Sequence, residues 1–154
     1  MGLPHRVLRE KAHRAAPGVK TLAVIASRGS FNSLVQVATL LMAAVASEMT
    51  VRVFFRDEAV LKLTRSRAGD MNLSEIYRGQ EAGMSERLRV QQLNDLPQLF
   101  ADVRRAGDVR LYVCSSSMAI CGVGAEDLLE GMEVRGLTAF LLEDMAAADH
   151  VLTF

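Results

Sequence analysis

Two cysteines, Cys114 and Cys121, are the residues of this sequence that point most directly to chemistry. Cys114 follows the apolar, β-like run 109–113 and precedes a segment of three serines. This order predicts a thiol at the carboxyl end of a strand, where open α/β sheets place their binding sites. A thiolate at the start of a helix is stabilised by free backbone N–H groups, which lower its pKa.

The serines Ser115, Ser116 and Ser117 add hydroxyl donors beside this thiol. Together with terminal backbone amides, such donors can hold a persulfide or thiosulfonate anion. The alternative is that both cysteines are small buried residues, as free cysteines often are. That alternative has more weight for Cys121 than for Cys114. We therefore predict Cys114 as the reactive thiol, Cys121 as a conditional second one, and the three serines as anion-binding residues.

The spacing of the two cysteines favours unequal roles. In a regular helix with a rise of ~1.5 Å per residue, they are about 10 Å apart. A disulfide needs Cα atoms within roughly 7 Å of each other. The separation holds only if Ser115 to Cys121 is regular. We predict one thiol that carries a group and a second that acts as acceptor, helper or bystander, rather than a redox couple.

A weaker candidate for anion binding is Arg28-Gly29, which with Ser30 follows the first predicted strand. It matches neither a phosphate-loop nor a dinucleotide fingerprint, and a plain turn is the alternative. The histidines lie far from the cysteines, without the spacing of zinc ligands. The sequence therefore predicts neither a metal nor a cofactor.

The elements that position these residues follow from apolar runs and breaks between them. Continuous apolar runs at 21–26 and 50–55 predict strands covered on both faces, joined by a helix that Ser30 or Asn32 caps. Further elements are a short helix within 57–64, a helix capped by Asn94 or Asp95, a strand at 109–113, a short helix from 124, a brief strand at 132–136, a helix at 137–147 and a last strand at 151–154. This alternation predicts a doubly wound α/β fold with a mostly parallel sheet of about five strands and helices on both faces.

Two segments stand apart from this alternation. Residues 1–18 are basic, lack apolar periodicity and are predicted to form a flexible arm, with a single domain at 19–154. Residues 65–92 are polar, contain three glycines and are predicted to be irregular. A long irregular segment is a functional loop, a lid or an interface element, or otherwise a solvated loop.

Composition excludes several classes of function. Lys plus Arg and Asp plus Glu are equal at 18 each, so the protein has no overall positive field that would favour binding to nucleic acid.

The apolar stretch 34–46 is shorter than the roughly 20 residues of a membrane span. We interpret it as a buried helix, which another subunit could also cover. The amino terminus lacks the apolar core of a secretory signal, which predicts a cytoplasmic protein.

The stretches 22–33, 51–55 and 96–121, with the ending 147–154, resemble the DsrE/DsrF-like family of small sulfur-handling proteins, particularly its branch with two nearby cysteines. The resemblance implies a DsrEFH-like homo-oligomer, often a trimer. It implies that Cys114 accepts sulfane sulfur and passes it to a TusA-like carrier or a related sulfur-relay protein, with Cys121 as the second cysteine of the branch. The serine run differs from the Thr/Met-rich sequence of many sulfur-oxidising members, which leaves the donor and the direction of sulfur flow open.

The main functional hypothesis is a sulfur carrier or sulfurtransferase that works through a cysteine persulfide or thiosulfonate. The alternative is a non-catalytic interaction subunit of a homo- or hetero-oligomer with this fold. A module that binds a small molecule or nucleotide ranks last, because the sequence has no phosphate motif.

Overall fold

The computed structural model of the protein describes residues 18–154. The predicted basic arm at 1–18 lies, except for its last residue, outside the described residues. No helix within the described part of the chain is both long and apolar enough to cross a membrane.

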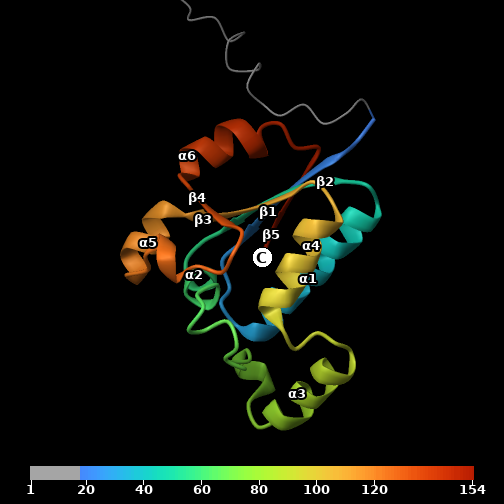
Figure 1. Ribbon diagram of the computed structural model, residues 1–154, viewed down its shortest axis with the longest axis vertical. Helices are drawn as coiled ribbons and strands as arrows, with labels where there is room; N and C mark the ends of the chain where they lie inside the picture. The colour runs from blue at the N-terminus through green and yellow to red at the C-terminus, as the bar shows by residue number, and fades with distance from the viewer. Residues whose placement is uncertain (1–17) are drawn as a thin grey trace, which may run out of the picture.

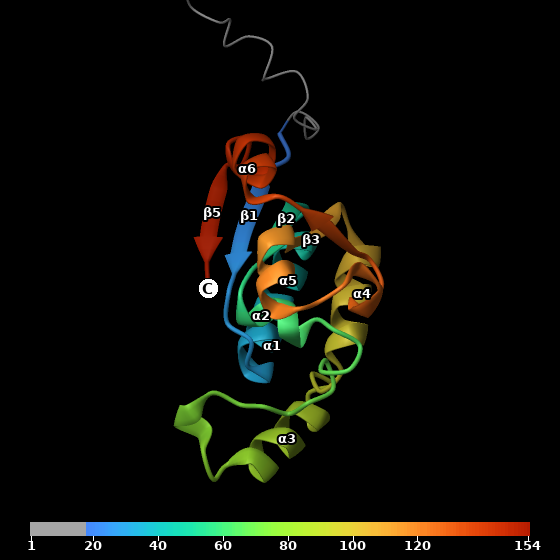
Figure 2. The same cartoon turned by 90° about the vertical axis from the view of Figure 1, so that its left-hand side faces the viewer.

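Five strands form one sheet in the order β4-β3-β2-β1-β5, and every neighbouring pair is parallel. The strands are β1 (Thr21–Ala26), β2 (Thr50–Phe55), β3 (Val109–Cys114), β4 (Met132–Arg135) and β5 (His150–Thr153). The predicted α/β fold with a parallel sheet is therefore confirmed. Because the strands are parallel, their carboxyl ends lie along one edge (Figures 1 and 2).

Helices cover both faces of the sheet (Figure 1). The long helices α1 (Phe31–Ala46) and α4 (Leu96–Ala106) pack against one face and against each other. Ser30 caps α1 and Asp95 caps α4, each accepting a backbone N–H three residues on, as their sequence positions predict. The other face is covered by α6 (Leu137–Ala139), which continues as the π-helix η3 (Phe140–Met145).

Two short helices follow the carboxyl ends of the central strands. α2 (Glu58–Lys62) begins shortly after β2, and α5 (Ser115–Cys121) begins directly after β3. The two helices contact each other. The 3-10 turn η2 (Ala125–Asp127) then leads to β4.

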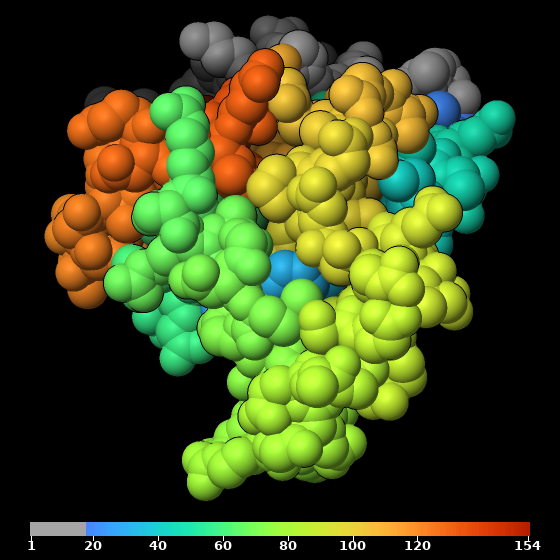
Figure 3. Space-filling view, turned by 60° about the horizontal axis from the view of Figure 1, so that its bottom comes forward, coloured from blue at the N-terminus to red at the C-terminus, as the bar shows by residue number. Residues whose placement is uncertain are grey.

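The prediction that residues 65–92 are irregular is wrong in its second half. The segment holds a 3-10 turn, η1 (Glu75–Tyr77), and the ten-residue helix α3 (Glu81–Val90), and it projects from the body of the protein (Figure 3). Leu88 is the one residue of α3 that is buried. A helix with so little apolar surface has no periodic stripe by which its sequence can be recognised.

Charged residues also lie inside the fold, on the face that α6 covers. Arg52 of β2 is only 5% exposed, and its guanidinium donates hydrogen bonds of 2.9 and 3.2 Å to the Asp108 carboxylate. Arg135 of β4 pairs with Glu143 at 2.6 Å and with Asp144 at 2.8 Å. A buried guanidinium is tolerated because carboxylates compensate its charge.

We predict that Asp108→Asn lowers the free energy of unfolding at neutral pH by about 1–2 kcal/mol, because it weakens hydrogen bonds to a buried cation. The hydrogen bonds from Arg52 lower the pKa of Asp108 from its usual 3.8, with burial opposing them. The stabilisation is therefore complete above about pH 4 and is lost as the pH falls through the lowered pKa. Urea unfolding at a series of pH values measures it, with the surface residue Asp102→Asn as control. A difference that persists at the acid end would contradict this assignment.

Candidate functional site

Cys114 is the last residue of β3, and its sulfur points to the face covered by α6. It is 0% exposed and packs in a cluster with Ala23, Phe54, Tyr112 and Phe140. Alternation along a strand explains this position, because Tyr112 and Cys114 face one side while Val113 faces the other. The sequence correctly placed the thiol at the strand end but did not indicate this complete burial.

The serines that follow Cys114 control its protonation. The Ser116 hydroxyl lies 3.2 Å from the sulfur. Burial of the sulfur raises the pKa, but hydrogen bonds from the hydroxyls and backbone N–H groups of Ser116 and Ser117 outweigh it and lower the pKa of Cys114 to about 7. Ser115 is exposed and makes no hydrogen bond to the sulfur. Two of the three predicted serines therefore meet the thiol.

The backbone of Asp57 connects the two cysteines. Its N–H donates a 3.1 Å hydrogen bond to the Ser117 hydroxyl, and its carbonyl accepts from the Cys121 thiol at 3.9 Å. Asp57 adopts φ 49° and ψ −129°, a conformation that is costly for a residue with a side chain. Strained residues persist where surrounding contacts hold them, and they are frequent at functional sites.

Cys121 lies at the last turn of α5 and is half-buried. It lines a hollow of about 270 Å³ at the carboxyl edge of the sheet, here called the Cys121 pocket, together with Ser27, Arg56, Asp57, Ser117 and Ile120. Both cysteines are free. Because α5 is helical from Ser115 to Cys121, the condition for the predicted separation of the two thiols is met.

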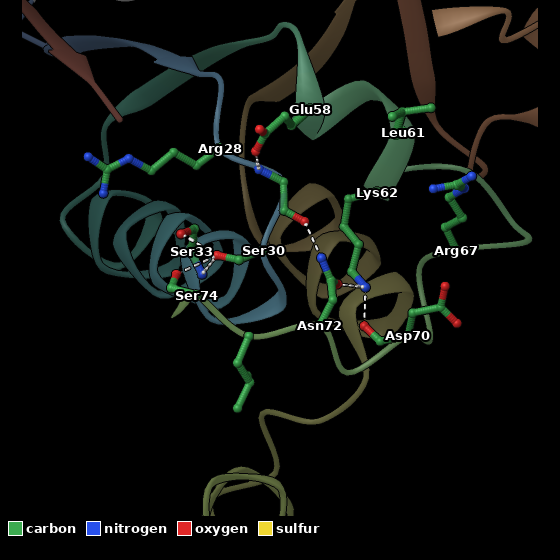
Figure 4. A pocket seen from close by; sticks show the side chains of 12 residues that line it. Arg28, Ser30, Ser33, Glu58, Leu61, Lys62, Arg67, Asp70, Asn72 and Ser74 are labelled. Atoms are coloured by element: carbon green, nitrogen blue, oxygen red, sulfur yellow. Dashed lines mark hydrogen bonds between the residues drawn. The ribbon is translucent and has the colours of Figure 1, made fainter. Parts of the chain in front are cut away.

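The structure separates Arg28 and Gly29 from the serine cluster. They line a second and larger hollow of about 710 Å³, formed with α2 and the segment 67–74 (Figure 4). The Gly29 N–H donates to the Glu58 carboxylate at 3.3 Å, so a carboxylate of the protein already occupies the place of an anion. Gly29 has a packing role, since a Cβ there would lie 2.5 Å from the carbonyl oxygen of Glu58.

The larger hollow is held together by its own polar groups (Figure 4). The buried Lys62 ammonium donates to the backbone carbonyl of Asp70 and, at 2.5 Å, to the side chain of Asn72. Asn72 in turn accepts the first N–H of α1, from Phe31, on its backbone carbonyl at 2.7 Å. The chain itself thus satisfies much of this helix N-terminus, which makes the hollow a poor anion site.

Sequence reasoning missed three residues of the site. Arg56 and Asp57 follow β2 just as Cys114 ends β3, so parallel register brings these strand ends together. Arg135 is the register partner of Cys114 on β4, and its guanidinium lies 4.8 Å from the centre of the Tyr112 ring. A sequence signal existed, because all three residues end or follow predicted strands. Strand order, which a sequence does not state, was needed to use it.

Among the residues that the structure describes, no group of three or more His, Cys, Asp or Glu side chains is arranged to hold a metal ion. The chemistry of the site therefore rests on its thiols and hydrogen-bond donors.

The fold and the site together define a class: a small α/β protein with a parallel sheet and a thiol of lowered pKa at its carboxyl edge. The sequence profile of the DsrE/DsrF-like family matches residues 20–154, and the chain belongs to this family. No curated protein matches it significantly.

Two solved structures are similar in fold. The ychN protein from E. coli has 19% sequence identity and a TM-score of 0.58, and the match covers 88% of this chain and all of the other. A protein of unknown function from Methanobacterium thermoautotrophicum, MTH1491, has 15% identity and a TM-score of 0.54, covering 86% and 98%. At these identities the comparison supports the fold alone.

We predict that the Cys114 thiol ionises with a midpoint of about pH 7, and that Ser116→Ala raises this midpoint by about one unit because it removes a donor to the thiolate. Ultraviolet absorbance of the thiolate in a Cys121→Ser background measures this without a reagent having to reach the buried sulfur. Ser115→Ala is the matched control and leaves the midpoint unchanged. An equal shift in both serine variants would show that Ser116 has no specific role.

We also predict that Gly29→Ala lowers the free energy of unfolding by about 1–3 kcal/mol, because α2 must move to admit a methyl group. Gly69→Ala is the control, since a Cβ there meets no atom within 4 Å, and its effect should stay within about 0.5 kcal/mol. Chemical denaturation of both variants measures the difference. Equal stability of the two would remove the packing explanation for Gly29.

Proposed function

We propose that the protein is a sulfur carrier or sulfurtransferase in which Cys114 accepts a sulfane sulfur and passes it to a partner protein. The observation that carries this proposal is the lowered pKa of Cys114, about 7, produced by the serine donors at the start of α5. A thiol with this pKa is substantially ionised at neutral pH, and the thiolate is the nucleophile. Membership of the DsrE/DsrF-like family is consistent with a sulfur-relay role.

The reaction needs no external oxidant. The Cys114 thiolate attacks the outer sulfur of a donor persulfide, a new S–S bond forms at Cys114, and the donor S–S bond breaks. The electron pair of the broken bond stays with the donor as its thiolate. The Ser116 and Ser117 donors that stabilise the Cys114 thiolate also suit the anionic persulfide that replaces it.

The burial of Cys114 sets how sulfur reaches it. At 0% exposure its sulfur is out of contact with solvent, whereas Cys121 is half-buried and lines a pocket. Sulfur therefore arrives either through a local opening of α5 or by way of Cys121. The second route gives Cys121 the helper role expected in the two-cysteine branch of the family.

We propose a TusA-like carrier or a related sulfur-relay protein as partner, and a homo-oligomer, with a trimer favoured, as the working form. We propose a cytoplasmic location, as predicted from the sequence, for the protein and its partner. One observation favours the alternative function, a non-catalytic interaction subunit. β5 is an edge strand, and its residues Val151 and Leu152, with Phe154 just after it, are each at least 41% exposed. Apolar side chains on an open edge are suited to a subunit contact.

The test is intact mass after incubation with polysulfide or with a persulfidated carrier protein. We expect wild type and Cys121→Ser to gain sulfur and Cys114→Ser to gain none that is transferable, because the low-pKa thiol has been removed. Transfer is measured as loss of the added mass when a thiol-bearing acceptor protein is supplied. A transferable adduct of undiminished size on Cys114→Ser, or no adduct on wild type, rules the proposal out and leaves the interaction subunit.

A further inference from the structure

We propose that Arg56 makes the Cys121 pocket selective for anions, so that Cys121 is reached preferentially by negatively charged sulfur donors. This inference deepens the proposed function and rests on it for its biological purpose. The pocket, the cation and the thiol are properties of the structure that can be tested separately.

The guanidinium of Arg56 has a buried nitrogen without a hydrogen-bond partner in the described residues. Arg56 follows β2 and lines the pocket. Its Nε is buried and has no hydrogen-bond partner within residues 18–154. A buried charged donor without a partner is unfavourable, and a bound anion would satisfy it. The Arg135 Nε is also without a hydrogen-bond partner, but the Arg52 and Arg135 guanidinium groups each pair with carboxylates, whereas no carboxylate of residues 18–154 pairs with Arg56.

The Cys121 pocket is lined by one basic and one acidic side chain. Asp57 is its one acidic residue, and no ion pair joins Asp57 to Arg56 in the described part of the chain. The Asp57 contacts described above are made by its backbone, whose N–H and carbonyl face Ser117 and Cys121. The positive charge of Arg56 is therefore available to a ligand.

The Cys121 pocket is small, and its lining includes a thiol. A hollow of about 270 Å³ lies below the roughly 300–1,000 Å³ typical of pockets for drug-sized ligands, so it suits a small anion or the tip of a partner chain. Ile120, one of its lining residues, is 86% exposed and Cys121 is partly exposed, so the lining of the hollow reaches the protein surface. An anion held by Arg56 in this space lies beside the Cys121 thiol, and positioning of this kind accelerates attack.

The larger hollow differs in that its arginines, Arg28 and Arg67, are exposed to solvent and its backbone and lysine donors already have internal partners. There Glu58 already accepts the Gly29 N–H, and Asn72 accepts both from Lys62 and, through its backbone, from the start of α1. An incoming anion would have to displace these internal partners. The anion site predicted at Arg28 and Gly29 stays a prediction, and these internal contacts favour Arg56 over it.

The experiment compares an anionic and a neutral reagent of similar size on one thiol. In a Cys114→Ser background, the rates at which iodoacetate and iodoacetamide alkylate Cys121 are measured by mass spectrometry. Arg56→Gln should slow iodoacetate about five- to tenfold, the effect of roughly one charge-assisted contact, and leave iodoacetamide within about twofold. Arg56→Lys should keep most of the iodoacetate rate, because the charge remains.

Arg28→Gln is the matched control, since it removes a guanidinium from the larger hollow and should change neither rate. If both reagents slow equally in Arg56→Gln, or if Arg28→Gln has the same effect as Arg56→Gln, the pocket is not an anion site. If Arg56→Gln fails to fold, Arg56→Met, which keeps much of the bulk without the charge, takes its place and should slow iodoacetate alone. The readout does not depend on sulfur transfer, so its failure is distinguishable from failure of the carrier proposal.

Discussion

The hydrogen bond from the Asp57 backbone to the Ser117 hydroxyl joins the ends of β2 and β3, and the geometry of the site depends on it. On one side, Ser117 is a donor to the Cys114 sulfur. On the other, the Asp57 carbonyl accepts from Cys121. A single strained residue thus fixes α5 against α2 and sets the surroundings of both thiols.

Cys114 combines burial with a lowered pKa, which are opposed in most proteins. Removing a thiolate from water raises its pKa, so short, directed hydrogen bonds must exceed that penalty. The start of α5 supplies them from two consecutive residues, Ser116 and Ser117. The same burial excludes water from the sulfur, and this would protect the persulfide that we propose for Cys114 from side reactions.

The sequence predicted the sheet well because parallel strands buried on both faces are continuous apolar runs, as in β1 and β2. It predicted the helix caps and the strand-end position of Cys114 for equally local reasons. It could not predict α3, which buries only Leu88 and has no continuous apolar stripe, or the burial of Cys114, which depends on Phe140 from a distant segment. The Asp57 backbone conformation is likewise set by contacts across the sheet edge, since nothing in its neighbouring residues requires it.

The close approach of Gly29 to α2 explains why one sheet edge carries two hollows of different character. Gly29 lets Glu58 reach the loop after β1, and both residues line the larger hollow, whereas neither lines the Cys121 pocket. On the Gly29 side, carboxylate and carbonyl groups of the chain satisfy the Gly29 N–H and the Lys62 ammonium, and Arg28 is exposed to solvent. On the far side, Arg56 has no such partner for its Nε and lies beside a thiol. The two hollows therefore differ in what an anion would meet: internal hydrogen bonds at Gly29 and Lys62 in the larger one, and in the Cys121 pocket a guanidinium without a carboxylate partner beside the thiol of the proposed sulfur chemistry.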